Sequence, residues 1–440
     1  MKTARSAALK IYTDIEEKNL YANLEVPKQL ALSSFSASDK ARITNLVHGS
    51  FRWQLTLLTS VEIASKRSIE EIDVNLRRLL VLASYELLFG KTAKEILVSE
   101  WVNEAKKNIS EKTAGFVNAV LRRISERDLN TWQTEILKRY PNRLDLVWSH
   151  PKWIIEEYRK LIHDENELTT LLAKNNDPPI LWSVDYNQKL SNNALSPTAK
   201  LATADDLKKI TSKQESNVKI QDAASQAAAF LLAKYRITEN ETDWLDACAA
   251  PGGKTAMLAN VAPTKDFQIT AVDIHPHKEQ LIKKNVANFR NVEIIIGDSR
   301  LSPWKNKKFD RILIDAPCTG LGAIRRRSES RWKKTPADMK NLTNNAKEIL
   351  DAAVKSSKND AFIEYVVCSP ILEETDYFVD WALQNYPELH LIPPAEYLPL
   401  FGEKISEEVV SVTNYGLRFW PHLHETDAMF VSLFQVKRSN

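Results

Sequence analysis

Cysteine is scarce in this 440-residue chain, which contains only Cys248, Cys318 and Cys368. So few thiols build no disulfide framework, and their spacing does not match a zinc site. A reducing compartment is therefore expected. We also expect no secretory signal, because acidic residues occur early in the N-terminal segment. No apolar run approaches the ~20 residues that cross a bilayer, so we expect a cytoplasmic protein without a membrane partner.

A strong excess of one charge sign is also missing, since the formal net charge is only +3. Bulk charge therefore gives no argument for a nucleic-acid partner, and such an argument must come from local patches. The hydrophobic fraction of 43% and the charged fraction of 27% are ordinary for globular proteins. At ~150 residues per domain, the length predicts two or three domains.

Hydrophobic periodicity divides the chain into three parts. In residues 1–128 apolar positions recur at helical spacing from Ile72 to Leu87, and Gly90 follows as a stop signal. We therefore expect an independent all-helical bundle. Residues 129–218 are richer in proline, asparagine and serine, which predicts a linker followed by a small mixed α/β region.

Residues 219–440 alternate between strand and helix patterns, which predicts a parallel sheet with helices on both faces. Ligands of such sheets bind outside the carboxyl ends of the strands, at the point where the strand order reverses. The expected strands cover residues 244–247, 269–272, 292–296, 311–314, 362–367 and 428–434, and the expected helices cover residues 254–261, 278–288, 339–354 and 374–383.

The first of these strands runs into DACAAPGGKT, residues 246–255. Its small residues and two glycines allow the backbone to approach a ligand, and the next helix aims N–H groups at it. An NTPase phosphate loop is disfavoured, because Cys248 stands where that motif requires glycine. A tight turn that merely closes a strand–helix unit is the plainer alternative.

Three aspartates follow successive strands of the predicted sheet: Asp273, Asp298 and Asp315. Asp273 comes nineteen residues after Lys254, a spacing that suits a ribose diol. Together the carboxylates could line one crevice and bind a nucleoside through its hydroxyl and amino groups. The G-x-G-x-x-G motif of dinucleotide sites is absent, so an adenosine cofactor without phosphates fits better. This pattern indicates S-adenosylmethionine (SAM).

Two cysteines follow the fourth and fifth strands, Cys318 in FDRILIDAPCTG and Cys368 in YVVCSP. If these strands are neighbours, both thiols reach one pocket. A thiolate that adds to carbon 6 of a pyrimidine makes carbon 5 nucleophilic, and a second group then removes the carbon 5 proton. Asp315 could bind the edge of the base. The residues alone do not decide which thiol attacks, and a structural role remains the alternative for a buried cysteine.

A basic segment follows Cys318, with six cations and one indole within residues 325–334. Cations suit phosphate contacts and an indole suits base stacking, so we expect RNA contacts here, with a solvated charged face as the alternative. His422 and His424 have no third ligand in view, so we expect them to shape a turn rather than bind metal. The expected RNA contacts are Arg325, Arg326, Arg327, Arg331, Trp332, Lys333 and Lys334.

FDRILIDAPCTG and DACAAPGGKT together resemble the signature of the RNA cytosine-C5 methyltransferases. The helical N-terminal part resembles the NusB-like domain of one branch, the RsmB (Sun/Fmu) family of 16S ribosomal RNA methyltransferases. Further similar stretches run along nearly the whole chain: FVNAVLRRI, SHPKWIIEEY, IQDAASQAAA and WPHLHETDAMF.

The resemblance implies a NusB-like RNA-binding domain over 1–128, a small RNA-binding region over 129–218 and a Rossmann-like class I methyltransferase domain over 219–440. It implies that Cys368 is the nucleophile and that Cys318 helps to release the product. Val367 departs from the family, which has threonine before the nucleophile. The implied cofactor contacts are Cys248, Ala249, Ala250, Pro251, Gly252, Gly253, Lys254, Asp273, Asp298 and Asp315.

The resemblance also implies small-subunit ribosomal RNA as the partner, with a monomer as the default expectation. A different class stays open from the residues: a non-catalytic RNA-binding assembly or antitermination factor that uses the NusB-like helices. The two cysteines, Asp273 and Lys254 argue against it, because a scaffold has no use for them. Titration with SAM and with ATP separates these hypotheses and the NTPase.

Overall fold

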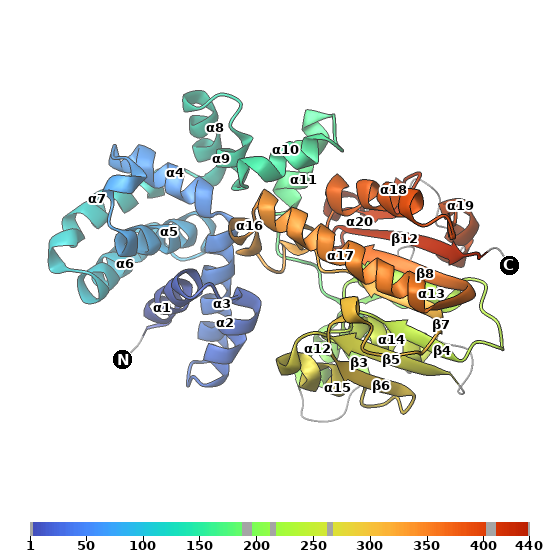
Figure 1. Ribbon diagram of the computed structural model, residues 1–440. Coiled ribbons are helices and arrows are strands. Elements are labelled where there is room, and N and C mark those ends of the chain that lie inside the picture. The colour runs from blue at the N-terminus through green and yellow to red at the C-terminus, as the bar shows by residue number, and fades with distance from the viewer. Residues whose placement is uncertain (1–2, 187–195, 212–216, 262–266, 402–410, 439–440) are drawn as a thin grey trace. The chain divides into compact units, whose positions relative to one another are not determined.

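The computed structural model describes residues 3–186, 196–211, 217–261, 267–401 and 411–438 (Figure 1). The chain forms two compact units: residues 1–178 with 324–333, and residues 179–323 with 334–440. This division is coarser than the three expected domains, whose limits at residues 128 and 218 stay predictions. Among the described residues, no helix has both the length and the apolar content that a bilayer crossing requires.

The first unit is helical, and α5 (Val74–Phe89) is its central helix. Nearly every side chain from Leu76 to Leu87 is buried, because α5 contacts helices on several sides. The Asp73 carboxylate accepts the N–H groups of Asn75 and Leu76 and so begins the helix. The neighbouring elements are α1 (Ala4–Glu17), α2 (Ala22–Ala31), α3 (Ala37–Arg52), α4 (Gln54–Ser65), η1 (Ile69–Glu71), α6 (Lys94–Asn108), η2 (Glu111–Thr113) and α7 (Ala114–Ser125).

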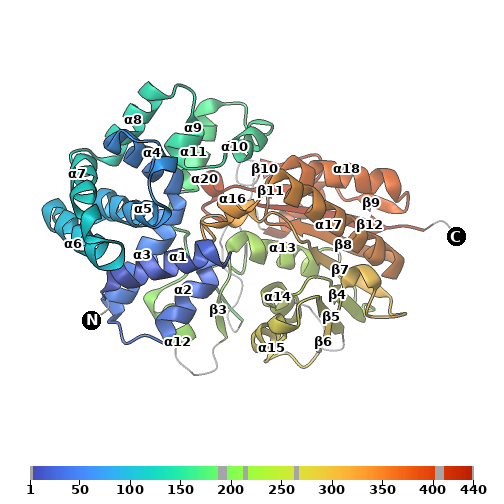
Figure 2. The same ribbon diagram turned by 60° about the vertical axis from the view of Figure 1, so that its left-hand side comes forward.

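The helices continue past the expected end of the bundle. α9 contacts α4, α8 and α10, and Figure 2 shows α8, α9 and α10 next to one another. The Thr56 hydroxyl on α4 donates to the Val147 carbonyl, which ties α9 to the bundle. Residues 129–178 are therefore part of the helical unit rather than a linker. The added helices are α8 (Leu129–Arg139), α9 (Leu144–Trp148), α10 (Lys152–Arg159), α11 (Glu165–Lys174) and, from a distant part of the chain, α16 (Ser330–Lys333).

The second unit is built on a mixed sheet with the order β10-β11-β12-β8-β7-β4-β5-β6, and β9 pairs with β12. The pairs β8–β7, β7–β4, β4–β5 and β5–β6 are parallel, as expected. The expected last strand is present as β12, but it runs antiparallel to β8. The strands are β4 (Asp243–Asp246), β5 (Gln268–Asp273), β6 (Val292–Ile296), β7 (Phe309–Asp315), β8 (Ser357–Val367), β9 (Leu389–Leu391), β10 (Ser411–Val412), β11 (Leu417–Phe419) and β12 (Met429–Val436).

Helices cover both faces of this sheet, because successive strand residues point to opposite sides. Leu313 and Phe362 belong to the apolar cluster that includes α13 and α14, whereas Ile312 and Ile363 belong to the cluster that includes α17 and α18. The helical elements are α13 (Ala223–Lys234), α14 (Gly253–Val261), η3 (Pro276–Lys278), α15 (Glu279–Val286), η4 (Ser299–Leu301), η5 (Leu321–Ala323), α17 (Pro336–Ser356), η6 (Leu372–Glu374), α18 (Asp376–Asn385), α19 (Pro394–Tyr397), η7 (Leu398–Phe401) and α20 (Pro421–His424).

A small antiparallel sheet, order β2-β1-β3, precedes the large one in the same unit. Its elements are β1 (Trp182–Asp185), β2 (Lys200–Leu201), β3 (Val218–Ile220) and the helix α12 (Ala204–Thr211). In the large sheet the chain proceeds from β4 outward to β5 and β6, and then returns to β7 on the other side of β4. The strand order therefore reverses between β4 and β7, where such sheets bind their ligands.

Candidate active site

The two cysteines at the ends of neighbouring strands lie together. Cys318 follows β7 by three residues, Cys368 directly follows β8, and their sulfur atoms are 3.5 Å apart. Both side chains are half-buried. The parallel pairing of β7 with β8, in the register Asp315↔Val366, brings the two strand ends to the same edge. The two strands are therefore neighbours and their thiols lie together, as the expected shared site requires.

Gly322 fixes the backbone between the two strand ends. Its N–H donates to the Cys368 carbonyl at 2.9 Å, and its own carbonyl accepts the Ala428 N–H at 3.0 Å. A Cβ atom at this position would lie 1.9 Å from the Ala428 oxygen and 2.9 Å from the Cys368 carbonyl carbon. Only glycine fits there without a shift of the backbone that carries Cys368. Apart from a glycine four residues after Cys318, no local pattern indicated this role.

Glu374 on η6 holds the residue next to Cys318. Its carboxylate accepts the Thr319 N–H and the Thr319 hydroxyl, both at 2.6 Å, and its side chain is buried. Burial raises the pKa of Glu374, while the bonds from Ser369 and Thr319 oppose that rise. The carboxyl group thus fixes the loop that presents Cys318. The sequence analysis missed this contact, because Glu374 lies fifty-five residues from Thr319.

A half-buried ion pair joins the cofactor strand–helix unit to the end of β7. The Lys254 ammonium contacts the Asp315 carboxylate at 2.7 Å. Burial by itself would lower the pKa of Lys254. The negative charges of Asp315, Cys368 and Asp246 together outweigh burial, so the pKa is raised. Lys254 therefore stays protonated, and its charge in turn favours a thiolate at Cys368.

The proton of the thiol pair is favoured on Cys318. The pKa of Cys318 is raised well above its usual value, first by the hydrogen bond with Cys368, then by burial and by the negative charges of Cys368 and Glu374. A raised pKa favours the thiol form of Cys318. The roles that the family resemblance implies for the two cysteines stay predictions.

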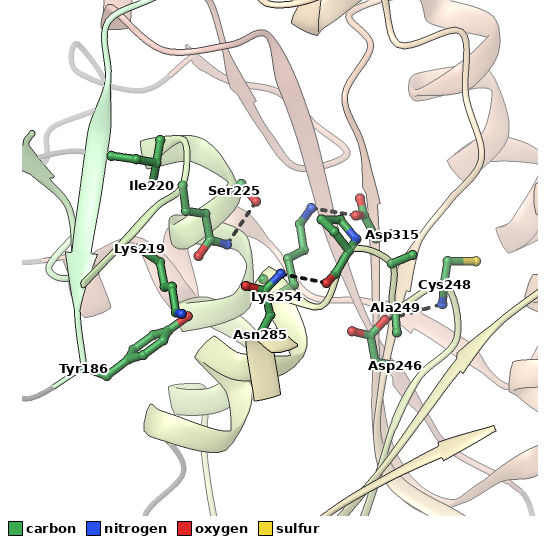
Figure 3. A pocket seen from close by; sticks show the side chains of 14 residues that line it. Tyr186, Lys219, Ile220, Ser225, Asp246, Cys248, Ala249, Lys254, Asn285 and Asp315 are labelled. Carbon is green, nitrogen blue, oxygen red and sulfur yellow. Dashed lines mark hydrogen bonds and ion pairs between the residues drawn. The ribbon is translucent and has the colours of Figure 1, made fainter. Parts of the chain in front are cut away.

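The loop after β4, residues 248–254 and hereafter the cofactor loop, lines a pocket of about 140 Å³ (Figure 3). Asp246 is buried at the base of this pocket, where its carboxyl group accepts the Thr255 hydroxyl at 2.6 Å. Burial raises the pKa of Asp246 to about 7, an effect that the Thr255 bond opposes and Asp315 supports. The lining residues are Tyr186, Lys219, Ile220, Gln221, Ser225, Asp246, Cys248, Ala249, Ala250, Pro251, Gly253, Lys254, Asn285 and Asp315.

Two of the expected cofactor aspartates lie outside this lining. Asp273 ends β5, and its carboxylate accepts the N–H groups of Ala250, at 3.1 Å, and His275, at 2.9 Å. Asp298 lies at the end of β6 and pairs with Arg300 at 2.6 Å. All three expected aspartates follow strands at the same edge of the sheet, but only Asp315 lines the pocket. The roles of Asp273 and Asp298 stay predictions.

Two of the expected RNA contacts are buried within the helical unit. The guanidinium group of Arg331 donates to the Ser149 carbonyl at 2.9 Å and to the Asn176 side-chain oxygen at 2.8 Å. Arg325 donates to the Pro178 carbonyl at 3.1 Å. Arg331 is 0% and Arg325 1% exposed, so neither offers a phosphate any surface. In this fold both arginines are structural rather than RNA contacts, contrary to the expectation.

The remaining residues of the basic run are more accessible. Trp332 is half-buried, and its indole N–H donates to the Phe51 carbonyl at 2.8 Å. Lys333 donates to the Leu20 carbonyl and lies 5.0 Å from the centre of the Tyr21 ring. Arg327 is exposed, and Arg326 and Lys334 are half-buried. RNA contacts by these residues stay predictions.

The histidines before β12 have a structural contact. The ring Nδ1 of His424 accepts the Trp420 N–H at 2.7 Å within the turn formed by α20. Burial lowers the pKa of His424 to about 4, and the neighbouring His422 adds to this effect. His424 is therefore neutral and shapes the turn, as the sequence suggested.

The donors and acceptors of the pocket suit a cofactor that carries an amino acid. The pocket combines two carboxylates, Asp246 and Asp315, with two lysines, Lys219 and Lys254. The described part of this loop does not contain the G-x-G-x-x-G motif that binds a pyrophosphate at a helix N-terminus. The residues therefore fit SAM better than they fit a nucleotide phosphate.

Comparisons with known proteins agree with this chemistry. Residues 230–435 match the family model of the 16S rRNA methyltransferases RsmB/F, and residues 2–126 match that of the NusB family. The chain is 33% identical to methyltransferase MT1451 of Mycobacterium tuberculosis over 98% of this chain and 95% of the relative. It is 28% identical to ribosomal RNA small subunit methyltransferase B of Proteus mirabilis over 85% of this chain and 90% of the relative.

The fold has a solved counterpart. The crystal structure of PH0851 matches 94% of this chain and 93% of its own, with a TM-score of 0.70 at 20% identity. At that identity the likeness concerns the fold alone. With a relative above 30% identity along nearly the whole length, the chain belongs to the RsmB/F family and is a SAM-dependent RNA methyltransferase.

Proposed function

We propose that this enzyme methylates carbon 5 of a cytosine in small-subunit ribosomal RNA through a covalent bond from Cys368 to carbon 6. The observation that carries the proposal is the 3.5 Å separation of the Cys318 and Cys368 sulfurs at the ends of adjacent strands. A methyltransferase that attacks a ring nitrogen or a ribose hydroxyl needs no thiol at its site. A pyrimidine carbon 5 needs two groups, one to add and one to remove a proton.

The Cys368 thiolate adds to carbon 6 and places electron density on carbon 5. Lys254, whose pKa is raised in part by Cys368, favours the thiolate before the addition. We assign Asp315, which accepts a hydrogen bond from Lys254 at 2.7 Å, to the edge of the base. When bound, SAM supplies the methyl group on a sulfonium.

Release of the product needs one proton transfer and one bond cleavage. The proton on carbon 5 leaves to a base, the double bond between carbons 5 and 6 re-forms, and the Cys368 sulfur is expelled with the bonding pair. We assign Cys318 to this step: its thiol donates its proton to the expelled Cys368 sulfur, which lies 3.5 Å away in the free enzyme, and the Cys318 thiolate so formed accepts the carbon 5 proton. Thr319 and Glu374 hold its loop in place.

The names of the relatives support ribosomal RNA of the small subunit as the substrate. With that substrate we expect the activity in the cytoplasm. The cytosine must leave its stack to reach the thiols, so we expect a target in a loop or bulge or in naked RNA. We propose that Asp273 and Asp298 bind the nucleoside end of the cofactor, next to the cofactor loop.

Bisulfite sequencing of small-subunit ribosomal RNA tests this function. A strain that lacks the enzyme should convert one more cytosine than its parent, because 5-methylcytosine resists deamination. A plasmid that carries the wild-type enzyme should restore the protected cytosine, and one that carries Cys368→Ala should not. An unchanged cytosine pattern in the deletion strain would contradict the proposed target.

A further inference from the structure

One cation of the pocket comes from outside the methyltransferase sheet. Lys219 lies on β3 of the small antiparallel sheet, and Tyr186 directly follows β1. The antiparallel pairing of β1 with β3 sets Val184 opposite Lys219, and the Tyr186 N–H extends it by donating to the Asn217 carbonyl at 3.2 Å. Tyr186 and Lys219 both line the pocket. Figure 3 shows the Lys219 ammonium and the Tyr186 hydroxyl together on one side of the pocket, across from Asp246.

The two lysines of the pocket differ in their partners. Lys254 is paired with Asp315 at 2.7 Å. Lys219 has no acidic partner among the described residues, and its pKa is lowered by burial and by the neighbouring charge of Lys284. A half-buried ammonium without a counter-ion is costly, and a bound anion removes that cost. The Gln221 side-chain oxygen, also in the lining, is buried and has no hydrogen-bond donor among the described residues.

The position of the pocket indicates which end of the cofactor it takes. Its volume of about 140 Å³ is well below the ~300 Å³ at which pockets for whole drug-sized ligands begin. Asp273 and Asp298, the proposed nucleoside contacts, are outside its lining, whereas Asp315 and Lys254, next to the thiols, are inside it. The amino-acid end of SAM carries an ammonium and a carboxylate, which match Asp246 and Asp315 on one side and a lysine on the other.

We propose that Lys219 binds the α-carboxylate of SAM and that the small antiparallel sheet is thereby part of the cofactor site. This inference rests on the proposed placement of the nucleoside end of SAM at Asp273 and Asp298. An ammonium–carboxylate hydrogen bond is a charge-assisted contact of about 1.5–3 kcal/mol, or about 10-fold to 100-fold in affinity. Lys219 touches the cofactor but not the reacting carbon, so it determines affinity and specificity rather than the chemical step.

Isothermal titration with two cofactors tests the contact. SAM and decarboxylated SAM differ by the carboxylate alone. Lys219→Ala should lower the affinity for SAM by about 10-fold or more, and the affinity for decarboxylated SAM by less than about twofold. Lys219→Gln should behave like Lys219→Ala, and a melting curve shows that both variants fold. The matched control is Lys283→Ala, on the exposed face of α15, where the lysine pairs with Glu279; its affinities should equal those of the wild type.

Two outcomes would overturn the inference, and a third would overturn only the proposed nucleoside contacts. Equal losses for both cofactors would mean that Lys219 only supports the pocket. Unchanged cofactor binding with weaker binding of a ribosomal RNA fragment, measured by fluorescence anisotropy, would assign Lys219 to an RNA phosphate instead. If the wild type binds SAM but Asp273→Ala leaves its affinity unchanged, the proposed nucleoside contacts fail, and the Lys219 contrast between the two cofactors still decides the carboxylate contact by itself.

Discussion

The Cys318 sulfur lies 3.5 Å from the Cys368 sulfur, and this neighbour is the largest cause of the raised pKa of Cys318. The raised pKa favours the thiol form of Cys318. Each cysteine variant should therefore fail at a different stage. Cys368→Ala should give neither methylated RNA nor an adduct, because no sulfur is available for carbon 6.

Cys318→Ala should form the methylated adduct and fail to release it. On a denaturing gel, incubation with SAM and substrate RNA should give a slower band that nuclease treatment removes. The double variant Cys318→Ala/Cys368→Ala should give no such band. Turnover by Cys318→Ala at the wild-type rate would refute the role assigned to Cys318.

Glu374→Gln should slow release rather than attack. The amide keeps the shape but loses one charged acceptor for Thr319, which costs about 1.5–3 kcal/mol and loosens the Cys318 loop. We expect turnover to fall by roughly 10-fold or more and the adduct to accumulate. Glu373→Gln changes the neighbouring residue of η6, which makes no such contact with Thr319, and serves as the control. An equal fall of turnover without adduct would place Glu374 in the attack step.

Gly322→Ala should damage the site through the backbone. The added Cβ would meet the Ala428 oxygen at 1.9 Å, so β8 or the β12 segment must shift. We expect a loss of about 1–3 kcal/mol in the free energy of unfolding and a large loss of methylation. Gly115→Ala is the control, since a Cβ there meets nothing within 4 Å. Wild-type activity in Gly322→Ala would mean that the end of β8 tolerates the shift.

Arg331→Ala should lower the stability of the fold, whereas Arg327→Ala should leave it nearly unchanged. Arg331 is buried and donates to several carbonyl groups of the helical unit, so its loss leaves them unsatisfied. We expect its removal to lower the free energy of unfolding by about 3 kcal/mol in urea titrations. Arg327 is exposed, so its removal should change that free energy by less than about 0.5 kcal/mol.

For RNA affinity we expect the substitution of Arg327 to be the one with a direct effect. Arg327→Ala should weaken RNA binding and reduce the salt slope by about 1, as the loss of one phosphate contact does. Anisotropy titrations at several salt concentrations measure this slope. A wild-type salt slope in Arg327→Ala would remove Arg327 from the RNA contacts.

His424 should contribute to acid sensitivity. Its pKa is about 4 in the folded protein and 6.5 in the unfolded chain, so the unfolded state takes up a proton that the folded state excludes. The stabilising contribution of the neutral ring is complete above pH 6.5 and declines as the pH falls towards 4. His424→Asn keeps an acceptor for Trp420 and should flatten the decline by up to about 1.4 kcal/mol per pH unit. Urea titrations between pH 7 and 4.5 measure it, and an unchanged decline would refute this contribution.

Local patterns in the sequence sufficed for the elements that carry the chemistry. Short apolar runs marked β4, β5, β6, β7 and β8, and each run leads within two residues to an aspartate or a cysteine. Strand ends at one edge of a parallel sheet share a ligand site. The adjacency of Cys318 and Cys368 was expected on the condition that β7 and β8 are neighbours, and the pairing of these strands meets that condition. The antiparallel course of β12 did not, because strand direction depends on pairing rather than on the residues of the strand.

Only the tertiary structure decided which cations of the basic run are buried and which residues line the pocket. Charge composition describes Arg325, Arg327 and Arg331 alike, but burial depends on carbonyl groups far away in the chain, such as those of Ser149 and Pro178. Lys219 reaches the cofactor loop through the pairing of β3 with β1, which no local pattern specifies. The sequence by itself determined which groups can react; the long-range contacts determined which of them share a cavity and which are sealed inside the fold, because burial is a property of the whole packed chain.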